Sequence, residues 1–257
     1  MTTGTTPGSR SVSDAGAPRA ARRFEHKYLV PESLLPPLRH LLAPFMRADR
    51  HATRGGEDGC RQYVVRSIYL DTPQLSYYHE TEDGIDFRAK PRIRAYDDAH
   101  ASAPVFLEVK RRHGAVVSKW REAVAFAELG ERPLARTIAI QLRRRALRPV
   151  LLVVYDREPY VGLLEPSLRI TFDRRLRSVA WPRLEGLFDE RGARPSLAGS
   201  FILEVKHDEA FGFPTWLRPF LTRHGLASRS LSKYWTCGAD QAIAQAPLSA
   251  RRSAALA

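Results

Sequence analysis

Polar and apolar residues alternate with a period of two through many of the patterned segments of the chain. The clearest case is a phrase that occurs twice, as Phe-Leu-Glu-Val-Lys at residues 106–110 and as Ile-Leu-Glu-Val-Lys at residues 202–206. In an extended chain the Glu and the Lys of each copy share one face, while the Leu and the Val lie on the other. The chain is therefore expected to build a sheet that carries charge on one face.

This alternation, together with β-branched and aromatic residues, predicts a series of strands. They span residues 24–30, 63–71, 85–96, 105–111, 115–122, 150–156, 168–173 and 201–207. Helical spacing of apolar residues predicts helices at 32–42, 74–82, 123–130, 133–148 and 214–226, and a last short helix that ends at 244. Residues 51–59, 97–104, 158–166 and 178–199 are expected to be loops or irregular segments. Hairpin signals outnumber strand-helix alternation, so the fold class is α+β, mostly antiparallel strands with a few helices.

One folded domain is expected over residues 22–244. Residues 1–21 are rich in Thr, Ser, Gly and Ala and are expected to form a disordered arm, and residues 245–257 a disordered tail. No stretch approaches the roughly 18 consecutive apolar residues of a membrane-spanning helix. The two cysteines, Cys60 and Cys237, set no disulfide framework, and a reducing, cytoplasmic location is expected.

Basic residues are in excess, because the 257-residue chain has 41 Lys and Arg against 28 Asp and Glu, a net charge of +13. This excess favours an anionic partner, whether a nucleic acid, a membrane surface or a phosphate compound. The sequence lacks the phosphate loops G-x-x-x-x-G-K-[ST] and G-x-G-x-x-G and the helix motif H-E-x-x-H. Recognition of an anion is therefore expected to come from Lys and Arg side chains.

The segment 85–96 concentrates this charge on one strand face. At a rise of roughly 3.4 Å per residue, alternate cations stand about 7 Å apart. The four in this row are Arg88, Lys90, Arg92 and Arg94. An anion that bridges them would relieve their repulsion, although a solvated amphipathic strand has the same pattern.

Further charged residues belong to the same face. Lys119 and Arg121, on the second arm of a predicted hairpin, add two cations. Glu108 and Glu204 lie beside cations, where a carboxylate either pairs with a neighbouring Lys or shares a divalent metal with the anion. The sheet itself can be one layer of a two-layer domain, or it can curl into a barrel that encloses the charged face, and the periodicity alone does not decide between them.

Eight motifs occur in a fixed order along residues 22–240. They are Glu25-His-Lys-Tyr28, Ser67-Ile-Tyr-Leu-Asp-Thr72, Lys90-Pro-Arg-Ile-Arg-Ala-Tyr96, Phe106-Leu-Glu-Val-Lys110, Tyr155-Asp-Arg157, Leu168-Arg-Ile-Thr-Phe-Asp173, Ile202-Leu-Glu-Val-Lys206 and Leu231-Ser-Lys-Tyr234. Together they resemble the VTC (vacuolar transporter chaperone) domain of polyphosphate polymerases, within the CYTH or triphosphate tunnel superfamily.

The resemblance implies an antiparallel β-barrel of about eight strands that forms a charged tunnel, with flanking helices. It implies an ATP-dependent polyphosphate polymerase that moves the γ-phosphate of ATP onto a growing chain and releases ADP. The implied cofactor is Mn²⁺ or Mg²⁺, and the implied partners are ATP and polyphosphate. A membrane protein is a further candidate partner, and nucleic acid is not expected.

The resemblance also implies roles for single residues. Motif matching gives phosphate-binding roles to Lys27, Arg92, Arg94, Lys110, Arg157 and Arg169, and Ser232 and Lys233 are expected to close that site. The other expected phosphate contacts are Arg88, Lys90, Lys119, Arg121 and Lys206. The residues expected to act in catalysis are Arg92, Arg94, Lys110 and Lys233. Glu204 is the expected metal ligand, with Glu25 and Glu108 as further candidates.

Two alternatives share this tunnel. Tunnel triphosphatases usually begin with Glu-x-Glu-x-Lys, whereas this chain has Arg23-Phe-Glu25-His-Lys27, which favours the handling of a polymer over hydrolysis. A non-catalytic module that binds polyphosphate or inositol phosphate is the second. A nucleic-acid-binding barrel is disfavoured, because Phe87 lies opposite the cations and, without metal, Glu108 and Glu204 would repel a phosphate backbone.

Overall fold

A computed structural model describes residues 23–52, 54–56, 58–97, 103–114, 116–129, 138 and 146–247. Its long strands are β1 (Arg23–Pro31), β4 (Arg61–Asp71), β5 (Phe87–Tyr96), β6 (Pro104–His113), β7 (Val116–Ala125), β8 (Arg148–Gly162), β9 (Arg169–Ala180) and β11 (Ser200–Asp208). Its short strands are β2 (Met46–Ala48), β3 (Arg54–Gly55) and β10 (Arg194–Pro195).

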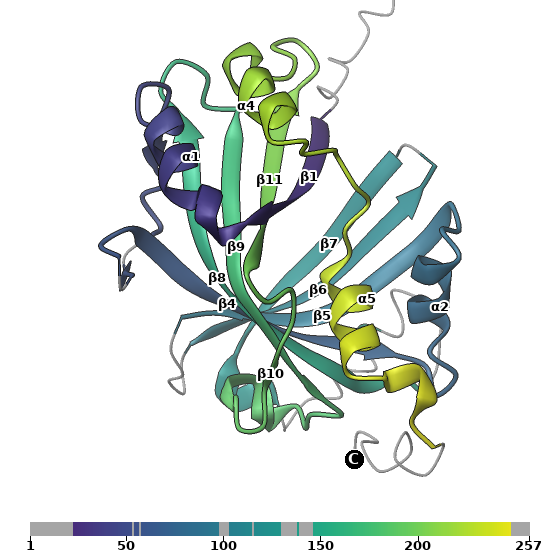
Figure 1. The fold of residues 1–257 in the computed structure, drawn as a ribbon. Helices are drawn as coiled ribbons and strands as arrows, with labels where there is room; N and C mark the ends of the chain where they lie inside the picture. Colours follow the sequence, from purple (N-terminus) through teal and green to yellow (C-terminus); the bar gives the residue numbers. More distant parts are fainter. Residues whose placement is uncertain are drawn as a thin grey trace, which may run out of the picture.

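The strands form one strongly curled antiparallel sheet (Figure 1). The long strands pair in the order β1-β11-β9-β8-β4-β5-β6-β7, while β10 pairs with β9, β2 with β8 and β3 with β4. β1 and β7 are the two ends of this order and do not pair with each other in the described part of the chain. The sheet is therefore a half-barrel with a concave and a convex face.

Short helices complete the domain. They are α1 (Leu35–Leu42), α2 (Ser76–Glu82), α4 (Arg218–Arg223) and α5 (Lys233–Asp240), with 3-10 turns η1 (Glu32–Leu34), η2 (Phe126–Leu129), η3 (Glu185–Phe188), η4 (Thr215–Leu217) and η5 (Ile243–Gln245). Among the described residues, no helix is long and apolar enough to cross a membrane.

Much of the convex face is apolar and carries two clusters. On β1, β9 and β11, buried residues such as Tyr28, Phe172 and Leu203 pack beneath α1 and α4 (Figure 1). On β4, β5, β6 and β8, a second cluster includes Ile93 and Leu107. These residues alternate with the charged ones, so burial of the apolar side turns the charged side inward.

Helices α2 and α5 cover part of the concave face. Tyr234 of α5 stacks on Tyr69 of β4 with ring centroids 4.7 Å apart, and both are buried with Tyr78 of α2. Asp71, at the end of β4, accepts the Tyr234 hydroxyl at 2.7 Å and the backbone N–H groups of Tyr77 and Tyr78 at 3.0 and 2.9 Å. One carboxylate therefore anchors both helices to the sheet.

The predicted α+β class, the antiparallel sheet and each of the predicted strands are confirmed. Most strands extend a few residues beyond their predicted ends, and β8 and β9 extend furthest because pairing continues there. β8 continues through residues 158–162, where a loop was expected, since it pairs with β2 and β9 there. β9 continues to Ala180 beyond a bulge at which Arg175 has a φ of 49°.

The helix predictions are less accurate. The helix predicted at 123–130 is wrong, because β7 stays paired with β6 to Ala125 and only η2 follows. The helix predicted at 214–226 is reduced to η4 and α4. Most of the helix predicted at 133–148 and the arm at 1–21 lie outside the described residues, as does the tail from residue 248.

Candidate functional site

Strand register aligns the cations of the concave face in rows across β5, β6 and β7. Lys90 lies opposite Lys110, and Lys110 lies opposite Lys119. The next row along the strands consists of Arg92, Glu108 and Arg121. A row of three lysines without a carboxylate therefore lies beside a row in which a glutamate separates two arginines.

Glu108 is the counter-ion of this second row. Its side chain is 0% exposed, and its carboxylate lies 2.7 Å from Arg92 Nη2, 2.6 Å from Lys119 Nζ and 2.9 Å from Arg121 Nε. Burial alone would raise the pKa of Glu108, but the cations, Arg92 and Arg94 first, lower it to about 2. Glu108 is therefore ionised at neutral pH and fully engaged by cations.

Asp173 and Glu204 are the acids on the other side of the concave face. The buried Asp173 carboxylate accepts hydrogen bonds of 2.6 and 2.8 Å from Arg157 and lies 2.5 Å from Lys233 Nζ. Glu204 lies 2.5 Å from Lys206 Nζ and 3.9 Å from Arg157 Nη2. Burial would raise the pKa of Glu204, but Lys206, followed by Lys27 and Arg157, holds it well below its ordinary value. Both carboxylates are thus held in the charged form.

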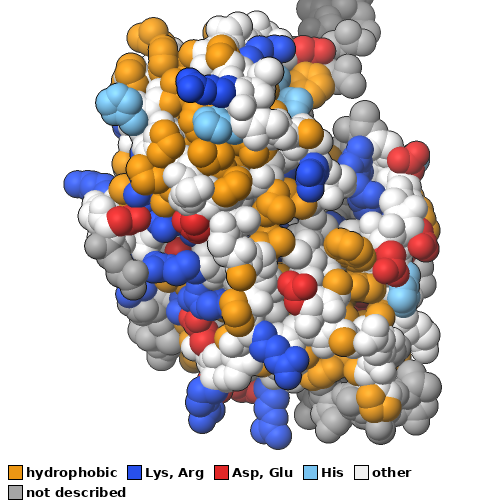
Figure 2. Space-filling view, in the orientation of Figure 1, with side chains coloured by type: hydrophobic (Ala, Val, Ile, Leu, Met, Phe, Trp, Pro, Cys, Tyr) orange, Lys and Arg blue, Asp and Glu red, His pale blue; other side chains and the backbone are white. Residues whose placement is uncertain are grey.

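Glu25 connects β1, one end of the sheet, with β6, the strand next to the other end. Its Oε1 lies 2.8 Å from Lys27 Nζ on β1, and its Oε2 lies 3.5 Å from Lys110 Nζ on β6. Residues 226–232, which connect α4 to α5, run beside β1 (Figure 1). Lys27 fixes this segment twice, since its carbonyl accepts the Arg229 N–H at 2.8 Å and its Nζ donates to the Leu231 carbonyl at 3.2 Å. In Figure 2, Lys and Arg side chains are visible between the regions of β1 and β7.

Lys90 has a different environment from the other cations of this face. Its Nζ lies 2.7 Å from the hydroxyl of Ser232, the residue that caps α5 by accepting the Trp235 N–H. Among the described residues, no carboxylate forms an ion pair with it. Burial, followed by the like charges of Lys27, Arg88, Lys110 and Arg92, lowers the pKa of Lys90 to about 7.

The carboxylates of the concave face fit a metal only when it is shared with a ligand. Mg²⁺ is usually held by one or two carboxylates together with substrate phosphates, and carboxylate oxygens suit Mn²⁺ equally. Neighbouring cations lower the pKa of Glu25 and of Asp173 against the cost of burial, and the charge of the nearby Glu204 opposes that lowering in both. No group of three or more His, Cys, Asp or Glu that could hold a metal ion is found in the part of the chain that the structure describes. The donor set therefore suits a metal held jointly with a phosphate.

The family model of the VTC domain matches residues 22–240. The chain belongs to the VTC domain family. No curated protein matches the chain significantly. Among solved structures, HpAC1 from Hippeastrum, reported to have a dominant triphosphatase activity, is similar at 16% sequence identity over 84% of this chain and 95% of that chain, with a TM-score of 0.47.

Membership of the VTC domain family confirms the resemblance found in the motifs. It supports a tunnel-type protein that acts on phosphate compounds, either a phosphotransferase or a triphosphatase. In this VTC domain the concave face brings together most of the residues expected at the site. They are Glu25, Lys27, Lys90, Arg92, Arg94, Glu108, Lys110, Lys119, Arg121, Arg157, Glu204, Lys206, Ser232 and Lys233.

Two of the expected residues, Arg88 and Arg169, lie at the margin of the concave-face site, and one residue of the site, Asp173, is not among those expected from the sequence. Arg88 donates to the Ile85 carbonyl at 3.4 Å, and Arg169 is 57% exposed and pairs with Asp49 at 3.3 Å. Asp173 was not proposed as a site residue, although it shares a strand face with Arg169 four residues earlier. Its role depends on Lys233, which comes from a helix sixty residues further along the chain, and no local pattern indicates that contact.

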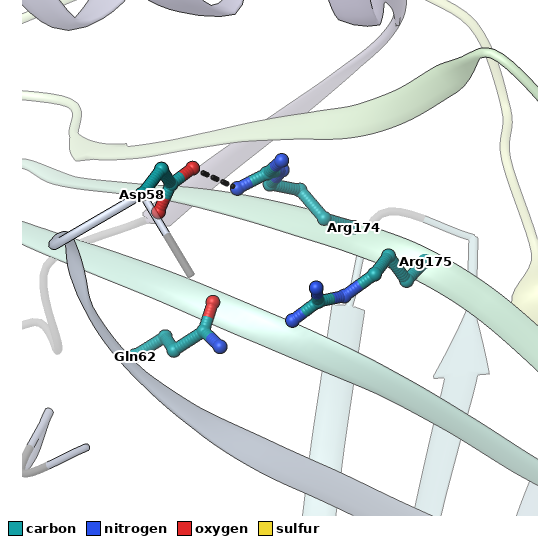
Figure 3. Close-up of a pocket in the computed structure, with 4 residues that line it drawn as sticks. All are labelled: Asp58, Gln62, Arg174 and Arg175. Atoms are coloured by element: carbon teal, nitrogen blue, oxygen red, sulfur yellow. Dashed lines mark hydrogen bonds and ion pairs between the residues drawn. The ribbon is translucent and has the colours of Figure 1, made fainter. Parts of the chain in front are cut away.

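A second polar cluster of this VTC domain lies on the opposite face of β8 and β9. Figure 3 shows its pocket, lined by Asp58, Gln62, Arg174 and Arg175. Arg174 pairs with Asp58 at 2.9 Å, and Arg175 pairs with the buried Asp156. Carboxylates therefore neutralise both arginines, and the cluster ties the segment before β4 to the sheet.

Proposed function

We propose that this VTC domain is a metal-dependent polyphosphate polymerase, which transfers the γ-phosphate of ATP to a growing polyphosphate chain and releases ADP. The observation that carries the proposal is the charged concave face, on which Lys90, Lys110 and Lys119 form a row without a carboxylate among them. Phosphoryl transfer requires alignment and neutralisation of charge, with little covalent work by the protein. A ring of lysines and arginines inside a half-barrel can provide both.

In this proposal the cations have two roles, according to where they lie on the concave face. Arg92 and Arg94 of β5, Lys110 of β6 and Lys233 of α5 neutralise the phosphate that is transferred. The remaining cations and Ser232 hold the other phosphates of ATP and of the chain. They are Lys27, Lys90, Lys119, Arg121, Arg157 and Lys206, with Arg88 and Arg169 at the margin. The incoming phosphates replace internal carboxylates, for example Glu25 at Lys110 and Asp173 at Lys233.

A Mn²⁺ or Mg²⁺ ion would be held by Glu204, with Glu25 beside it, together with phosphate oxygens of the ligand. When bound, the ion supplies additional neutralisation of the phosphate charge. Glu108 is the weaker candidate, because Arg92, Lys119 and Arg121 already occupy its carboxylate.

A triphosphatase is the second candidate function, in which water attacks instead of a chain end. Its supporting observation is Glu25, the acid that remains of the Glu-x-Glu-x-Lys pattern and that pairs with Lys27 at 2.8 Å on the same face. A non-catalytic phosphate-binding module would use the same cations without turnover.

Incubation with ATP and Mn²⁺ separates these functions. We expect a stained gel to show polyphosphate and the assays to show ADP without an equivalent amount of free phosphate. Free phosphate without polymer would instead identify a triphosphatase. Binding of tripolyphosphate without either product would identify a non-catalytic module and contradict the proposal.

The Glu204→Gln variant tests the metal site in the same assay. Gln keeps the size of the side chain but removes the charge that hard cations require, so we expect turnover to fall by about 100-fold or more and half-saturation with Mn²⁺ to shift upward. Asp189→Asn is the control, since among the described residues the ion-pair partner of Asp189 is the exposed Arg191. An unchanged Mn²⁺ titration in Glu204→Gln would show that Glu204 is not the ligand.

A further inference from the structure

Lys90 is the least compensated cation of the concave face. Lys27 and Lys110 share Glu25, Lys119 contacts Glu108, and Lys206 contacts Glu204, all within 3.5 Å. Among the described residues, the polar partner of Lys90 is the neutral hydroxyl of Ser232, at 2.7 Å, and no carboxylate pairs with it. A half-buried ammonium in this position has four cations around it and no counter-ion to offset the cost of its charge.

The groups that face Lys90 come from several elements. They are Lys27 on β1, Arg88 and Arg92 on β5, Lys110 on β6 and Ser232 at the start of α5. Behind Lys110 lie Glu25, its ion-pair partner, and Lys119, which is opposite it in the sheet. Glu25 is already engaged by two lysines. Like charges therefore dominate the field at Lys90, and they favour the neutral amine.

We propose that Lys90, held on Ser232, forms a subsite for the terminal phosphate group of a linear polyphosphate, which it distinguishes from an internal phosphate by sharing that group's proton. The inference rests on the proposed function and specifies which part of the substrate this position receives. A terminal phosphate has a second dissociable proton with a pKa of about 6, as phosphate monoesters do. An internal phosphate has no proton that dissociates near neutral pH.

For a ligand that arrives with its second proton, the transfer balances without a further reactant, and for a ligand that has already lost it the solvent supplies the proton. The O–H bond of the terminal phosphate breaks, the oxygen keeps the electron pair as its second negative charge, and the amine lone pair of Lys90 forms the new N–H bond. The products are a phosphate dianion and an ammonium in contact. The burial and like charges that lower the pKa of Lys90 to about 7 bring it close to that of its ligand, so either group can hold the proton.

In the proposed reaction, contact with Lys90 determines the ionisation state of the acceptor, which is the terminal phosphate of the growing chain. A chain end at Lys90 is fully ionised, and its oxygen is a better nucleophile toward the γ-phosphate of ATP than a protonated one. An internal phosphate at this position would require Lys90 to draw its proton from the solvent, and it would offer only one negative charge in return.

The test compares linear tripolyphosphate, which has two terminal groups, with cyclic trimetaphosphate, which has none. Dissociation constants are measured by calorimetry at pH 7 without metal for wild type, Lys90→Met and Lys110→Met. Lys110 is the matched control, because it lies opposite Lys90 in the sheet but has Glu25 as a partner. We expect Lys90→Met to reduce the preference for the linear ligand by about tenfold, the factor that one pKa unit represents, and Lys110→Met to weaken both ligands by similar factors.

Proton uptake gives an independent readout. At pH 8 the terminal phosphate has already lost its second proton and Lys90 in the empty protein is mostly neutral, so the proton that the pair shares comes from the buffer. Calorimetry in two buffers of different ionisation heat should therefore show that tripolyphosphate binding takes up close to one proton. Lys90→Arg keeps the charge at every pH, so it should bind tripolyphosphate without this uptake. This variant also decides the question if Lys90→Met fails to fold.

The outcomes separate the two proposals. If wild type binds neither ligand, the proposed function fails together with this inference. If tripolyphosphate binds but the linear preference is unchanged in Lys90→Met, or proton uptake persists in Lys90→Arg, the inference alone is wrong and the tunnel remains a phosphate site.

Discussion

Glu108 and Asp189 are two carboxyls whose neighbours hold their pKa values at about 2, in opposite surroundings. Asp189 pairs with Arg191, whose side chain is 90% exposed, so solvent screens the pair. The Glu108 side chain is 0% exposed and has Arg92, Lys119 and Arg121 within 2.9 Å. A lowered pKa is therefore expected to reflect a contribution to the stability of the protein at Glu108 and not at Asp189.

The Glu108→Gln substitution should reveal this difference at the scale of one residue. Removing the charge leaves three cations without their counter-ion, so we expect the free energy of unfolding at pH 7 to fall by about 3 kcal/mol. Affinity for tripolyphosphate should rise, because the ligand no longer competes with Glu108. Urea denaturation and calorimetry measure the two effects.

The pH dependence provides the control for this prediction. Because the folded-state pKa of Glu108 lies below its ordinary value of 4.5, its contribution is present above pH 4.5 and is lost as pH falls toward about 2. Wild type should lose more stability than Glu108→Gln across that window, and Asp189→Asn should behave as wild type. Parallel curves for wild type and Glu108→Gln would mean that the buried network contributes nothing to stability.

At the scale of elements, helix α5 positions both Ser232 and Lys233. Its other end depends on Gly238, because a Cβ built there would lie 2.6 Å from the Tyr78 ring and 2.8 Å from Ile243 Cδ1. This close approach seats α5 against Tyr78 of α2. Asp71 accepts the backbone N–H of Tyr78 and the hydroxyl of Tyr234 of α5, so it holds both helices. The geometry of two tunnel residues therefore depends on a contact remote from the phosphates.

We expect Gly238→Ala to lower the free energy of unfolding by about 1–2 kcal/mol, since overpacking costs about 1–3 kcal/mol and the better helix propensity of alanine offsets at most about 1 kcal/mol. It should also weaken tripolyphosphate binding by displacing Lys233. Gly186→Ala is the control, because nothing lies within 4 Å of a Cβ at that glycine of η3. Equal stabilities of the two variants would show that α5 can shift without cost.

The sequence predicts those features of the fold and site that depend on neighbouring residues. Alternation places Glu108 and Lys110 on one face and Leu107 and Val109 on the other, and the structure has them so. It does not predict which strands pair, and for this reason it predicts a loop at the end of β8, where the structure has a paired strand. For the same reason it indicates cations but not their counter-ions, such as Asp173 for Lys233.

On the scale of the whole molecule, the half-barrel has two ends that charge holds together. β1 and β7 do not pair within the described residues, and Glu25 connects β1 to β6 through Lys110 at 3.5 Å. A polyphosphate that contacts cations from both sides of the sheet would replace this single carboxylate by several anionic oxygens. The ligand is therefore expected to take over the role of Glu25 in the filled tunnel.

Glu25→Gln tests this exchange in the absence of metal, with a chelator present. The pairs of Glu25 are partly exposed, with Lys27 and Lys110 side chains at 23% and 36% exposure, so the loss should be about 1 kcal/mol. For a chain of this size that corresponds to a melting temperature lower by about 2–4 °C. With saturating tripolyphosphate the difference from wild type should vanish or reverse, because the variant also removes a negative charge beside the phosphates. A difference that stays constant as tripolyphosphate is added would mean that the ligand does not bridge the two ends, and Asp189→Asn should melt with wild type throughout.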